Sequence, residues 1–430
     1  MSATLPPPPV DPVDLGLALL FDVMHSLRMG PRIRRFAILA AGNLLVFVAL
    51  ILVVEFSAAR CVTRPAGNTV PHSRLNHTWK PNATKVHAEW VEDNPDFPEP
   101  YVHHYNSQGW LERYDVSRRK PPNIYRIFYL GDSFTEGTCA MEASVPSLVE
   151  AQINERISET GWQVEVVNTG TSSYSPTLFY LLFRHELLRY EPDLIVVNVD
   201  MTDAFDDWKY AQALVVDDQG DPVAAPPRAL YSAGFLETEA GIVLATPWRR
   251  MVLFLYRNSH TFNWVLGLTR GSRAEARVRG GPEQAGEIDR WSWCRHRWDD
   301  SARRNVARTL NMLRRLIHLS QENGVAVMLT AAPHFWQYAR STDGGGPPAW
   351  SARPHYVLAN LAQQLGVPYL NSYEALAPHI QGTQQTRFYY AGDMHFNPRG
   401  YAIWADAQIA FLTDPGNGLL PEHLAQAAAP

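Results

Sequence analysis

A serine and a histidine, far apart in the sequence, are the residues best suited to chemistry. Ser133 lies in the segment YLGDSFTEG, residues 129–137, and His395 lies in GDMHFNPRG, residues 392–400. A serine hydroxyl is a weak nucleophile until an imidazole takes its proton, and a carboxylate can fix the tautomer of that imidazole and stabilise its charge. Asp393 stands two residues before His395. The sequence therefore predicts a catalytic set of Ser133, His395 and Asp393.

Each half of this set also has an ordinary structural explanation. Ser133 could cap a helix, and Asp393 with His395 could form a surface turn. The occurrence of both segments in one chain favours the catalytic interpretation. The first segment has neither the G-x-G-x-x-G pattern nor a Walker lysine, which excludes a dinucleotide loop and a P-loop.

Short apolar runs indicate the elements that would position these residues. Residues 125–130, 164–167, 194–199 and 325–329 are expected to be buried parallel strands. Helical stretches separate them, such as 303–322, which has an apolar stripe and ends at Asn323-Gly324. This alternation predicts a three-layer α/β/α domain. Ser133 would then follow the first strand, at the edge of the sheet where ligands bind.

The two segments resemble the first and last boxes of the SGNH (GDSL-like) hydrolases, over about residues 125–412. The resemblance implies a flavodoxin-like α/β/α domain that hydrolyses or transfers acyl groups, many of them acetyl groups on carbohydrate. It also implies that no metal and no organic cofactor takes part. The family's aspartate usually precedes its histidine by three residues, whereas the spacing from Asp393 to His395 is similar to that of alginate-type O-acetyltransferases of the same class.

The resemblance further implies an oxyanion hole, to which Ser133 and a second box contribute. The second box of the family supplies a glycine N–H group. Alignment from Asn168 places Ser173 at that glycine, with Gly170 as a second choice. A backbone N–H group survives the change to serine.

The third box of the family normally supplies an asparagine side chain. Counting along the strand from residues 192–193 places Thr202 at that position, with Asn198 as a second choice inside the strand. Loss of one oxyanion donor costs ~2.7–4 kcal/mol in other serine enzymes. The two substituted boxes therefore bear on catalytic efficiency and not on the fold.

An uncharged apolar stretch, residues 36–54, is about long enough to cross ~30 Å of hydrocarbon. Four arginines at positions 28, 32, 34 and 35 precede it and Glu55 follows it, so the positive-inside rule places the N-terminus in the cytoplasm. The stretch is long for a signal peptide, and residues 56–59 are a weak cleavage site. We expect one uncleaved span in the inner (plasma) membrane and a periplasmic or extracellular catalytic domain.

The expected organisation has five parts. Residues 1–35 would be a cytoplasmic tail, 36–55 the anchor, and 56–123 an irregular extension lying on the catalytic domain. Residues 124–415 would form the catalytic domain, with 208–300 as an insertion over the site, and 416–430 a C-terminal tail. The apolar segment 251–268 contains Arg257 and His260, which makes it unsuited to a second span.

Composition excludes one class of partner. The formal net charge is −5 and the pI is near 6.3, so no broad basic field would attract nucleic acid. The three cysteines show no zinc-binding spacing. The sequence does not decide whether Cys139 and Cys294 form a disulfide. Cys139 is expected inside a helix, where it would pack as a small hydrophobic residue.

Other conspicuous residues have two interpretations. His103, His104 and His334 lack ligand spacing and are expected to be hydrogen-bonded or solvent-facing. Tryptophans and arginines alternate near the end of the insertion and could form a sugar-binding surface or simply pack it: Trp291, Trp293 and Trp298 with Arg290, Arg295 and Arg297.

Together these patterns predict a serine esterase that cleaves an acyl group, in particular acetyl, from an envelope glycan or a small ester outside the cytoplasm. An O-acyltransferase of a cell-envelope polysaccharide is the nearest alternative, because both reactions begin with an acyl-Ser133 intermediate. A weakly active glycan-binding scaffold is a third possibility, which the substituted oxyanion boxes favour.

Overall fold

The computed structural model describes residues 30–61, 69–87, 96–97, 99–227, 235–238, 241–244, 259, 261, 290–338 and 350–429. The chain divides into two compact units. One comprises Met1–Ala66 with Arg250–Gly281, and the other Gly67–Arg249 with Pro282–Pro430.

The second unit contains a five-stranded sheet in the order β13-β12-β7-β5-β6, with every neighbouring pair parallel. Its strands are β5 Ile124–Leu130, β6 Gln163–Asn168, β7 Leu194–Val199, β12 Ala326–Ala331 and β13 Tyr369–Leu370. Numbered along the chain, the spatial order is 2-1-3-4-5, which is the flavodoxin-like arrangement. The four expected strands are confirmed, and the two-residue β13 is an addition.

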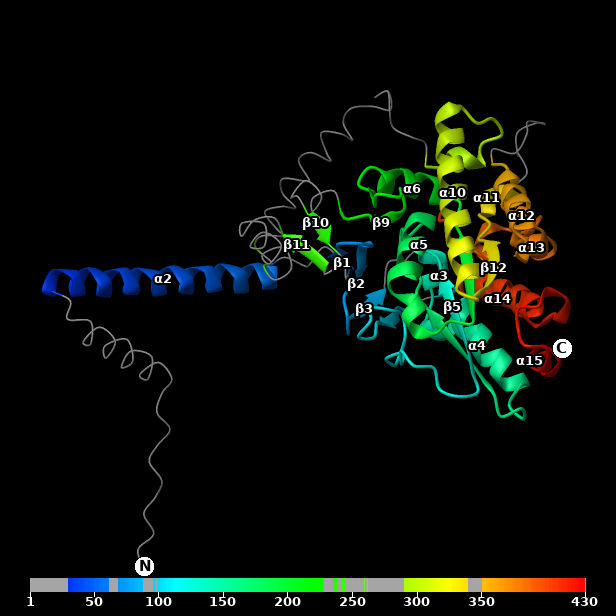
Figure 1. The fold of residues 1–430 in the computed structure, drawn as a ribbon, viewed down its shortest axis with the longest axis horizontal. Coiled ribbons are helices and arrows are strands. Elements are labelled where there is room, and N and C mark those ends of the chain that lie inside the picture. Colours follow the sequence, from blue (N-terminus) through cyan, green and yellow to red (C-terminus); the bar gives the residue numbers. More distant parts are fainter. Residues whose placement is uncertain are drawn as a thin grey trace, which may run out of the picture. The chain divides into compact units, whose positions relative to one another are not determined.

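Helices cover both faces of this sheet, as Figure 1 shows. One face packs against α5 Pro176–His185, α6 Asp203–Ala211, α10 Asp300–Glu322 and α12 Arg353–Leu365. The other packs against α4 Val145–Arg156, α13 Ser372–Ile380, α14 Pro398–Thr413 and α15 Glu422–Ala428. Alternate residues of β5 enter the two cores, Phe128 on one side and Tyr129 on the other. The predicted three-layer α/β/α class is confirmed.

The helix expected at 303–322 is α10, and its ends have clear causes. It starts three residues earlier because the Asp299 carboxylate accepts the Ala302 N–H at 2.7 Å and caps it. It ends at Glu322, after which Gly324 takes a left-handed φ of +70°. The buried stripe, including Val306, Leu313 and Ile317, faces the sheet.

The segment before the sheet is more regular than expected. It contains two antiparallel pairs, β1 Thr69–His72 with β2 Asn76–Trp79, and β3 Thr84–His87 with β4 Tyr101–His104. Trp79 stacks on Tyr105 with ring centroids 4.5 Å apart, in a small core with Leu111 and Met141. The expectation of an irregular extension is therefore wrong for these residues.

Two further local expectations, those for Cys139 and for residues 416–430, are wrong, and the disulfide that the sequence left undecided is not formed. Cys139 is buried but lies in a bend outside any helix, because the short α3 Ser133–Glu136 ends before Gly137, whose φ is +95°. Cys139 and Cys294 belong to different core clusters and do not form a disulfide. Residues 416–430, expected as a tail, include α15, whose Leu424 is buried against the sheet layer.

Most of the expected insertion lies outside the described residues. Within 208–300 the structure describes two short pairs, β8 Val215–Val216 with β9 Pro222–Ala224 and β10 Phe235–Thr238 with β11 Gly241–Leu244. The segment 251–268 is described only at Ser259 and Thr261.

The first unit contains the helix α2 Pro31–Cys61. Its segment Leu39–Ser57 has a mean hydropathy of 2.4, and in the described part of the chain it is the one helix long and apolar enough to cross a membrane. Within this unit the Glu55 carboxylate accepts hydrogen bonds from Ser259 Oγ at 2.8 Å and Thr261 N at 3.2 Å. The tail before residue 30, including Arg28, lies outside the described residues.

Candidate active site

Ser133 begins α3 directly after β5. The chain turns at Gly131, where a Cβ would lie 1.9 Å from Thr135 Oγ1, so only glycine permits this close approach. Asp132, and not Ser133, caps the helix, because its carboxylate accepts the Phe134 N–H at 2.9 Å. The Ser133 hydroxyl is therefore left for another partner at the carboxyl end of the sheet.

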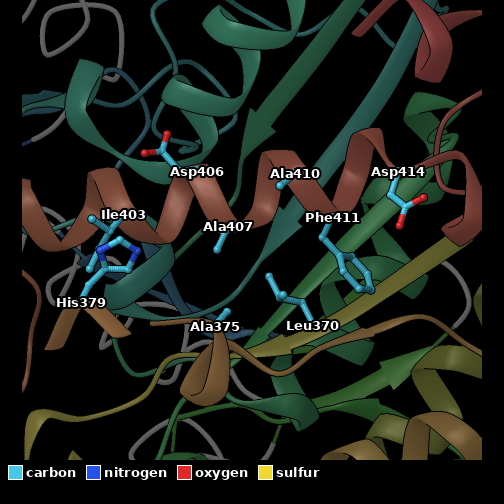
Figure 2. Close-up of a pocket in the computed structure, with 9 residues that line it drawn as sticks. All are labelled: Leu370, Ala375, His379, Ile403, Asp406, Ala407, Ala410, Phe411 and Asp414. Atoms are coloured by element: carbon cyan, nitrogen blue, oxygen red, sulfur yellow. The ribbon is translucent and has the colours of Figure 1, made fainter. Parts of the chain in front are cut away.

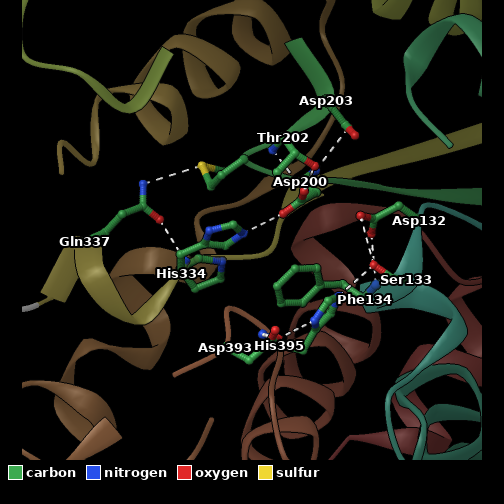
Figure 3. A network of polar contacts seen from close by, with 12 residues as sticks. Asp132, Ser133, Phe134, Asp200, Thr202, Asp203, His334, Gln337, Asp393 and His395 are labelled. Carbon is green, nitrogen blue, oxygen red and sulfur yellow. Dashed lines mark hydrogen bonds and ion pairs between the residues drawn. The ribbon is translucent and has the colours of Figure 1, made fainter. Parts of the chain in front are cut away.

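That partner is His395, from a loop 262 residues further along the chain. Ser133 Oγ lies 2.7 Å from His395 Nε2, and His395 Nδ1 lies 2.5 Å from Asp393 Oδ1 (Figure 3). Asp393 Oδ1 also accepts the backbone N–H of His395 at 2.8 Å, which explains how a two-residue spacing can orient the ring. The three residues form one continuous hydrogen-bonded chain.

The electrostatics favour an ionised Asp393. Burial raises the pKa of the Asp393 carboxyl, but the hydrogen bond and charge of His395 lower it by more. The net pKa is therefore below its ordinary value. A carboxylate at this position fixes the proton on Nδ1 and leaves Nε2 as the acceptor for the Ser133 proton.

Asp132 is the competing acceptor for that proton, with Oδ2 at 3.4 Å from Ser133 Oγ. Burial and the nearby charge of Asp200 raise the pKa of Asp132 well above its ordinary value. The longer distance and the reduced charge both favour His395 as the acceptor of the serine proton.

A second histidine lies behind the site, where sequence reasoning did not expect it. The Phe134 ring lies against His395, with centroids 4.8 Å apart, and against His334, with centroids 5.3 Å apart. His334 Nε2 is 2.6 Å from Asp200 Oδ1, and both side chains are buried (Figure 3). No spacing in the sequence links these two residues, which are 134 positions apart.

Asp200 in turn holds Thr202, the candidate for the third oxyanion box. Its Oδ2 accepts the Thr202 N–H at 2.9 Å and also the Thr202 hydroxyl. Burial raises the pKa of Asp200, but His334 and Thr202 lower it more, so the net pKa is below its ordinary value. The hydroxyl expected to serve the oxyanion is thus donated to a buried carboxylate in this structure.

Asn198, the second choice for that box, is buried, and its side chain contacts Thr135 of α3. Its Nδ2 donates to Thr135 Oγ1 at 2.9 Å, and its buried Oδ1 has no hydrogen-bond partner among the described residues. The Thr202 hydroxyl and one of the two Nδ2 hydrogens of Asn198 are thus already donated within the protein.

Ser173, the second-box candidate, has an unusual backbone. Its φ of +65° lies in the left-handed region that non-glycine residues rarely adopt. Its carbonyl accepts the Tyr210 hydroxyl at 2.6 Å, while its N–H has no acceptor among the described residues. By contrast, the Gly170 N–H donates to Asn168 Oδ1 at 3.0 Å and is already used.

Each of the three alternating tryptophans makes contacts within the protein. Trp293 is fully buried, and its Nε1 donates to the Met201 carbonyl at 2.8 Å, so it packs the core. Trp298 carries the Arg353 guanidinium 3.8 Å above its ring. Trp291 contacts His334, with ring centroids 5.2 Å apart.

Two groups of described residues have possible metal-ligand atoms within 4.8 Å of one another, namely His87, His103 and Glu136, and Asp132, Asp200 and Asp203. Hydrogen bonds from neighbouring protein groups already reach both oxygens of Glu136 and both of Asp200. The expectation of a metal-free site stays a prediction.

A separate pocket of about 440 Å³ lies between α13 and α14 (Figure 2). Its lining includes His379, Ile403 and Asp406, and none of the three candidate catalytic residues takes part in it.

The fold and site define an α/β protein with a flavodoxin-like sheet and a serine, histidine and aspartate aligned at its carboxyl edge. No family model and no curated protein matches the sequence. Among solved structures, the chain is similar to LAE5, an alpha/beta hydrolase enzyme from the metagenome of Lake Arreo, Spain, at 12% identity and a TM-score of 0.37, covering 69% of this chain and 96% of that chain.

It is also similar to a catalytic mutant of Axe2, an acetylxylan esterase from Geobacillus stearothermophilus, at 10% identity and a TM-score of 0.38, covering 66% and 92%. A two-domain esterase active on acetylated mannans gives 12% identity and a TM-score of 0.34, covering 71% of this chain and 51% of that chain. These identities are too low for the neighbours' substrates to carry over, so function has to follow from this chain's own side chains.

Proposed function

We propose that this protein is a serine esterase of the SGNH class, in which Ser133 is the nucleophile, His395 the general base and Asp393 the residue that orients His395. The observation that carries the proposal is the unbroken chain of contacts, 2.7 Å from Ser133 to His395 and 2.5 Å from His395 to Asp393. An ordinary surface turn gives no reason for this alignment with a serine at a strand end.

The reaction follows from these atoms. His395 Nε2 takes the Ser133 proton while Oγ attacks the ester carbonyl and forms a tetrahedral oxyanion. Collapse of this species breaks the bond to the alkoxy oxygen, which leaves as an alcohol after it receives the proton from His395. Water, deprotonated by His395, then attacks the acyl-Ser133 carbonyl, and the carboxylic acid leaves as the serine hydroxyl is restored.

The backbone N–H groups of Ser133 and Ser173 are the donors we propose for the oxyanion. The left-handed φ of Ser173 supports this, because strained backbone tends to be kept where it serves a site. Thr202 could join them only by releasing Asp200.

The substrate we propose is an acylated glycan of the cell envelope, or a small ester, on the outer side of the membrane. The anchor-like helix α2 supports a location at the membrane. O-acyl transfer to a polysaccharide is the second candidate, because it passes through the same acyl-Ser133 intermediate and differs only in the hydroxyl group that attacks it.

The test uses the full-length protein in detergent with p-nitrophenyl acetate and a fluorophosphonate probe. Ser133→Ala should abolish both turnover and labelling, whereas Ser158→Ala, at an exposed serine of the same domain, should leave both unchanged. A Ser133→Ala protein with native circular dichroism and parental turnover would refute the proposal. Adding a soluble sugar acceptor and measuring the acylated product separates transfer from hydrolysis.

A further inference from the structure

Glu136 is a buried carboxylate close to the candidate nucleophile that the proposed reaction does not use. It is the last residue of α3, three positions after Ser133, and is 3% exposed. Its Oε1 accepts the Tyr105 hydroxyl at 2.7 Å, and His103 Nδ1 lies 3.5 Å from the same oxygen. Both partners come from β4 Tyr101–His104 and the residue after it, in the extension before the sheet.

The other oxygen of Glu136 holds the loop of the second oxyanion box. Glu136 Oε2 accepts the Ser172 hydroxyl at 2.9 Å and the Ser172 N–H at 3.2 Å. Ser172 directly precedes Ser173, the residue with the left-handed φ. One carboxylate thus joins the helix that begins with Ser133 to the loop that carries the second candidate N–H.

The extension holds the same loop from a second side. His77 Nε2 lies 2.9 Å from the Ser172 carbonyl oxygen. The Tyr174 hydroxyl donates to the His77 carbonyl at 2.6 Å, so contacts run in both directions between β2 and the loop. The conformation at Ser173 is therefore fixed largely by contacts from outside the loop itself.

A charged Glu136 suits this role. Burial raises the pKa of its carboxyl, but hydrogen bonds and charge from His103, with hydrogen bonds from Tyr105 and Ser172, lower it more, so the net pKa is below its ordinary value. Hydrogen bonds to a buried carboxylate are shorter and stronger than neutral ones, which favours a single loop geometry.

We propose that Glu136 is a positioning residue for the oxyanion hole. Together with Tyr105 and His77 it forms a clamp on the loop at Ser172, so the extension is part of the active site. The role of the clamp rests on the proposed function. It holds residues 171–174 so that the Ser173 N–H meets the developing oxyanion. Small displacements of such a donor weaken transition-state binding more than substrate binding.

The test is Glu136→Gln in the full-length protein. The amide keeps the size of the side chain but cannot accept hydrogen bonds on both sides. We expect kcat to fall roughly tenfold with little change in KM, less than the ~10²–10³-fold loss that follows removal of an oxyanion donor. Tyr105→Phe and Ser172→Ala should each give a smaller fall in kcat. Asp115→Asn is the matched control, because this exposed carboxylate of the extension accepts only a local N–H, from Ser107 at 2.8 Å.

Hydrogen exchange supplies a readout that does not depend on turnover. Amides of residues 171–174 should exchange faster in Glu136→Gln, while those of β7 keep their parental protection. Parental kcat together with parental exchange in a folded Glu136→Gln protein would overturn the inference, as would a loss of protection that extends to β7. If Glu136→Gln does not fold, parental kcat in both Tyr105→Phe and Ser172→Ala overturns it. An inactive parent enzyme refutes the proposed function instead, and the exchange measurement still decides whether the clamp exists.

Discussion

At the scale of single residues, Asp393 orients the His395 ring although its own side chain is partly exposed. It accepts both the ring Nδ1–H and the backbone N–H of His395, so it fixes the ring plane and the tautomer together. An aspartate three residues away could not make the same pair of contacts without a different loop. The two-residue spacing is thus compatible with a carboxylate that orients His395.

Asp393→Asn tests this role. The amide can hold the ring in place but can donate to Nδ1, which would move the imidazole proton to Nε2 and remove the base. We expect kcat to fall by roughly 10²–10⁴, as for related substitutions in other serine enzymes, with KM nearly unchanged. Steady-state kinetics on p-nitrophenyl acetate would measure it. Asp406→Asn, at an exposed carboxylate on α14, is the control, and equal losses in both variants would contradict the assignment.

The left-handed backbone of Ser173 predicts how substitutions there change stability. Ser173→Gly should keep or raise the free energy of unfolding and retain kcat, because glycine adopts a φ of +65° without strain and keeps the N–H. Ser173→Val should lower the free energy of unfolding by roughly 1–2 kcal/mol, since the left-handed region disfavours a side chain and a β-branched one most. Urea denaturation of both variants is the measurement. A valine variant as stable as the glycine variant would show that this backbone conformation is not kept in solution.

At the scale of elements, the extension and the sheet edge share a buried carboxyl, Glu112. Its Oε1 accepts the Asn168 N–H at the end of β6 at 2.7 Å, and the Leu111 N–H donates to the Asn168 carbonyl. Burial, opposed in part by that hydrogen bond and supported by the charges of Glu150 and Glu165, raises the pKa of Glu112 to about 8.

This shift gives stability a definite dependence on pH. The unfolded chain releases the Glu112 proton near the ordinary pKa of 4.5, whereas the folded protein keeps it up to about 8. As the pH rises between these values, the unfolded state loses the proton while the folded state keeps it. The free energy of unfolding therefore falls progressively over this range. Glu112→Gln removes the titrating group but keeps an oxygen for Asn168. Its free energy of unfolding, relative to the parent, should increase from pH 5 to pH 8 in urea titrations. A difference that stays constant over that range would show that Glu112 titrates normally.

The elements that the sequence predicts well are those whose pattern is local. Buried parallel strands are continuous apolar runs, so the ranges of β5, β6, β7 and β12 follow from composition to within two residues. The two-residue β13 is too short to show a period. The paired strands of the extension depend on turns such as that at Asn76, whose φ is +60°, and alternation there is weak.

The candidate site divides in the same way. Ser133, His395 and Asp393 could be singled out because their types and spacing carry the chemistry. Glu136, Asp200 and His334 could not, because each was an unremarkable polar residue until folding buried it beside a partner. Thr202 shows the reverse: alignment places it at a donor position, but the neighbouring Asp200 takes its hydroxyl.

At the scale of the whole molecule, α2 is the feature that bears on where the protein acts. A 31-residue helix with no buried residue in its most apolar window cannot be stabilised by a core of its own. Lipid would cover that surface and supply the missing burial. A catalytic domain tethered in this way would act on substrates that stay close to the membrane.

The positive-inside rule predicts the orientation of such an anchor, because arginines precede the apolar stretch and Glu55 follows it. We predict that green fluorescent protein fused before Met1 is fluorescent in the cytoplasm and that the same reporter fused after Pro430 is dark when exported unfolded. Alkaline phosphatase, which needs an oxidising exterior to form its disulfides, should be active after Pro430 and inactive before Met1. Replacing the four arginines at positions 28, 32, 34 and 35 by serine should weaken this preference and yield a mixed population. Fluorescence after Pro430 together with inactive phosphatase there would place the catalytic domain in the cytoplasm, and the envelope glycan would then have to be abandoned as its substrate.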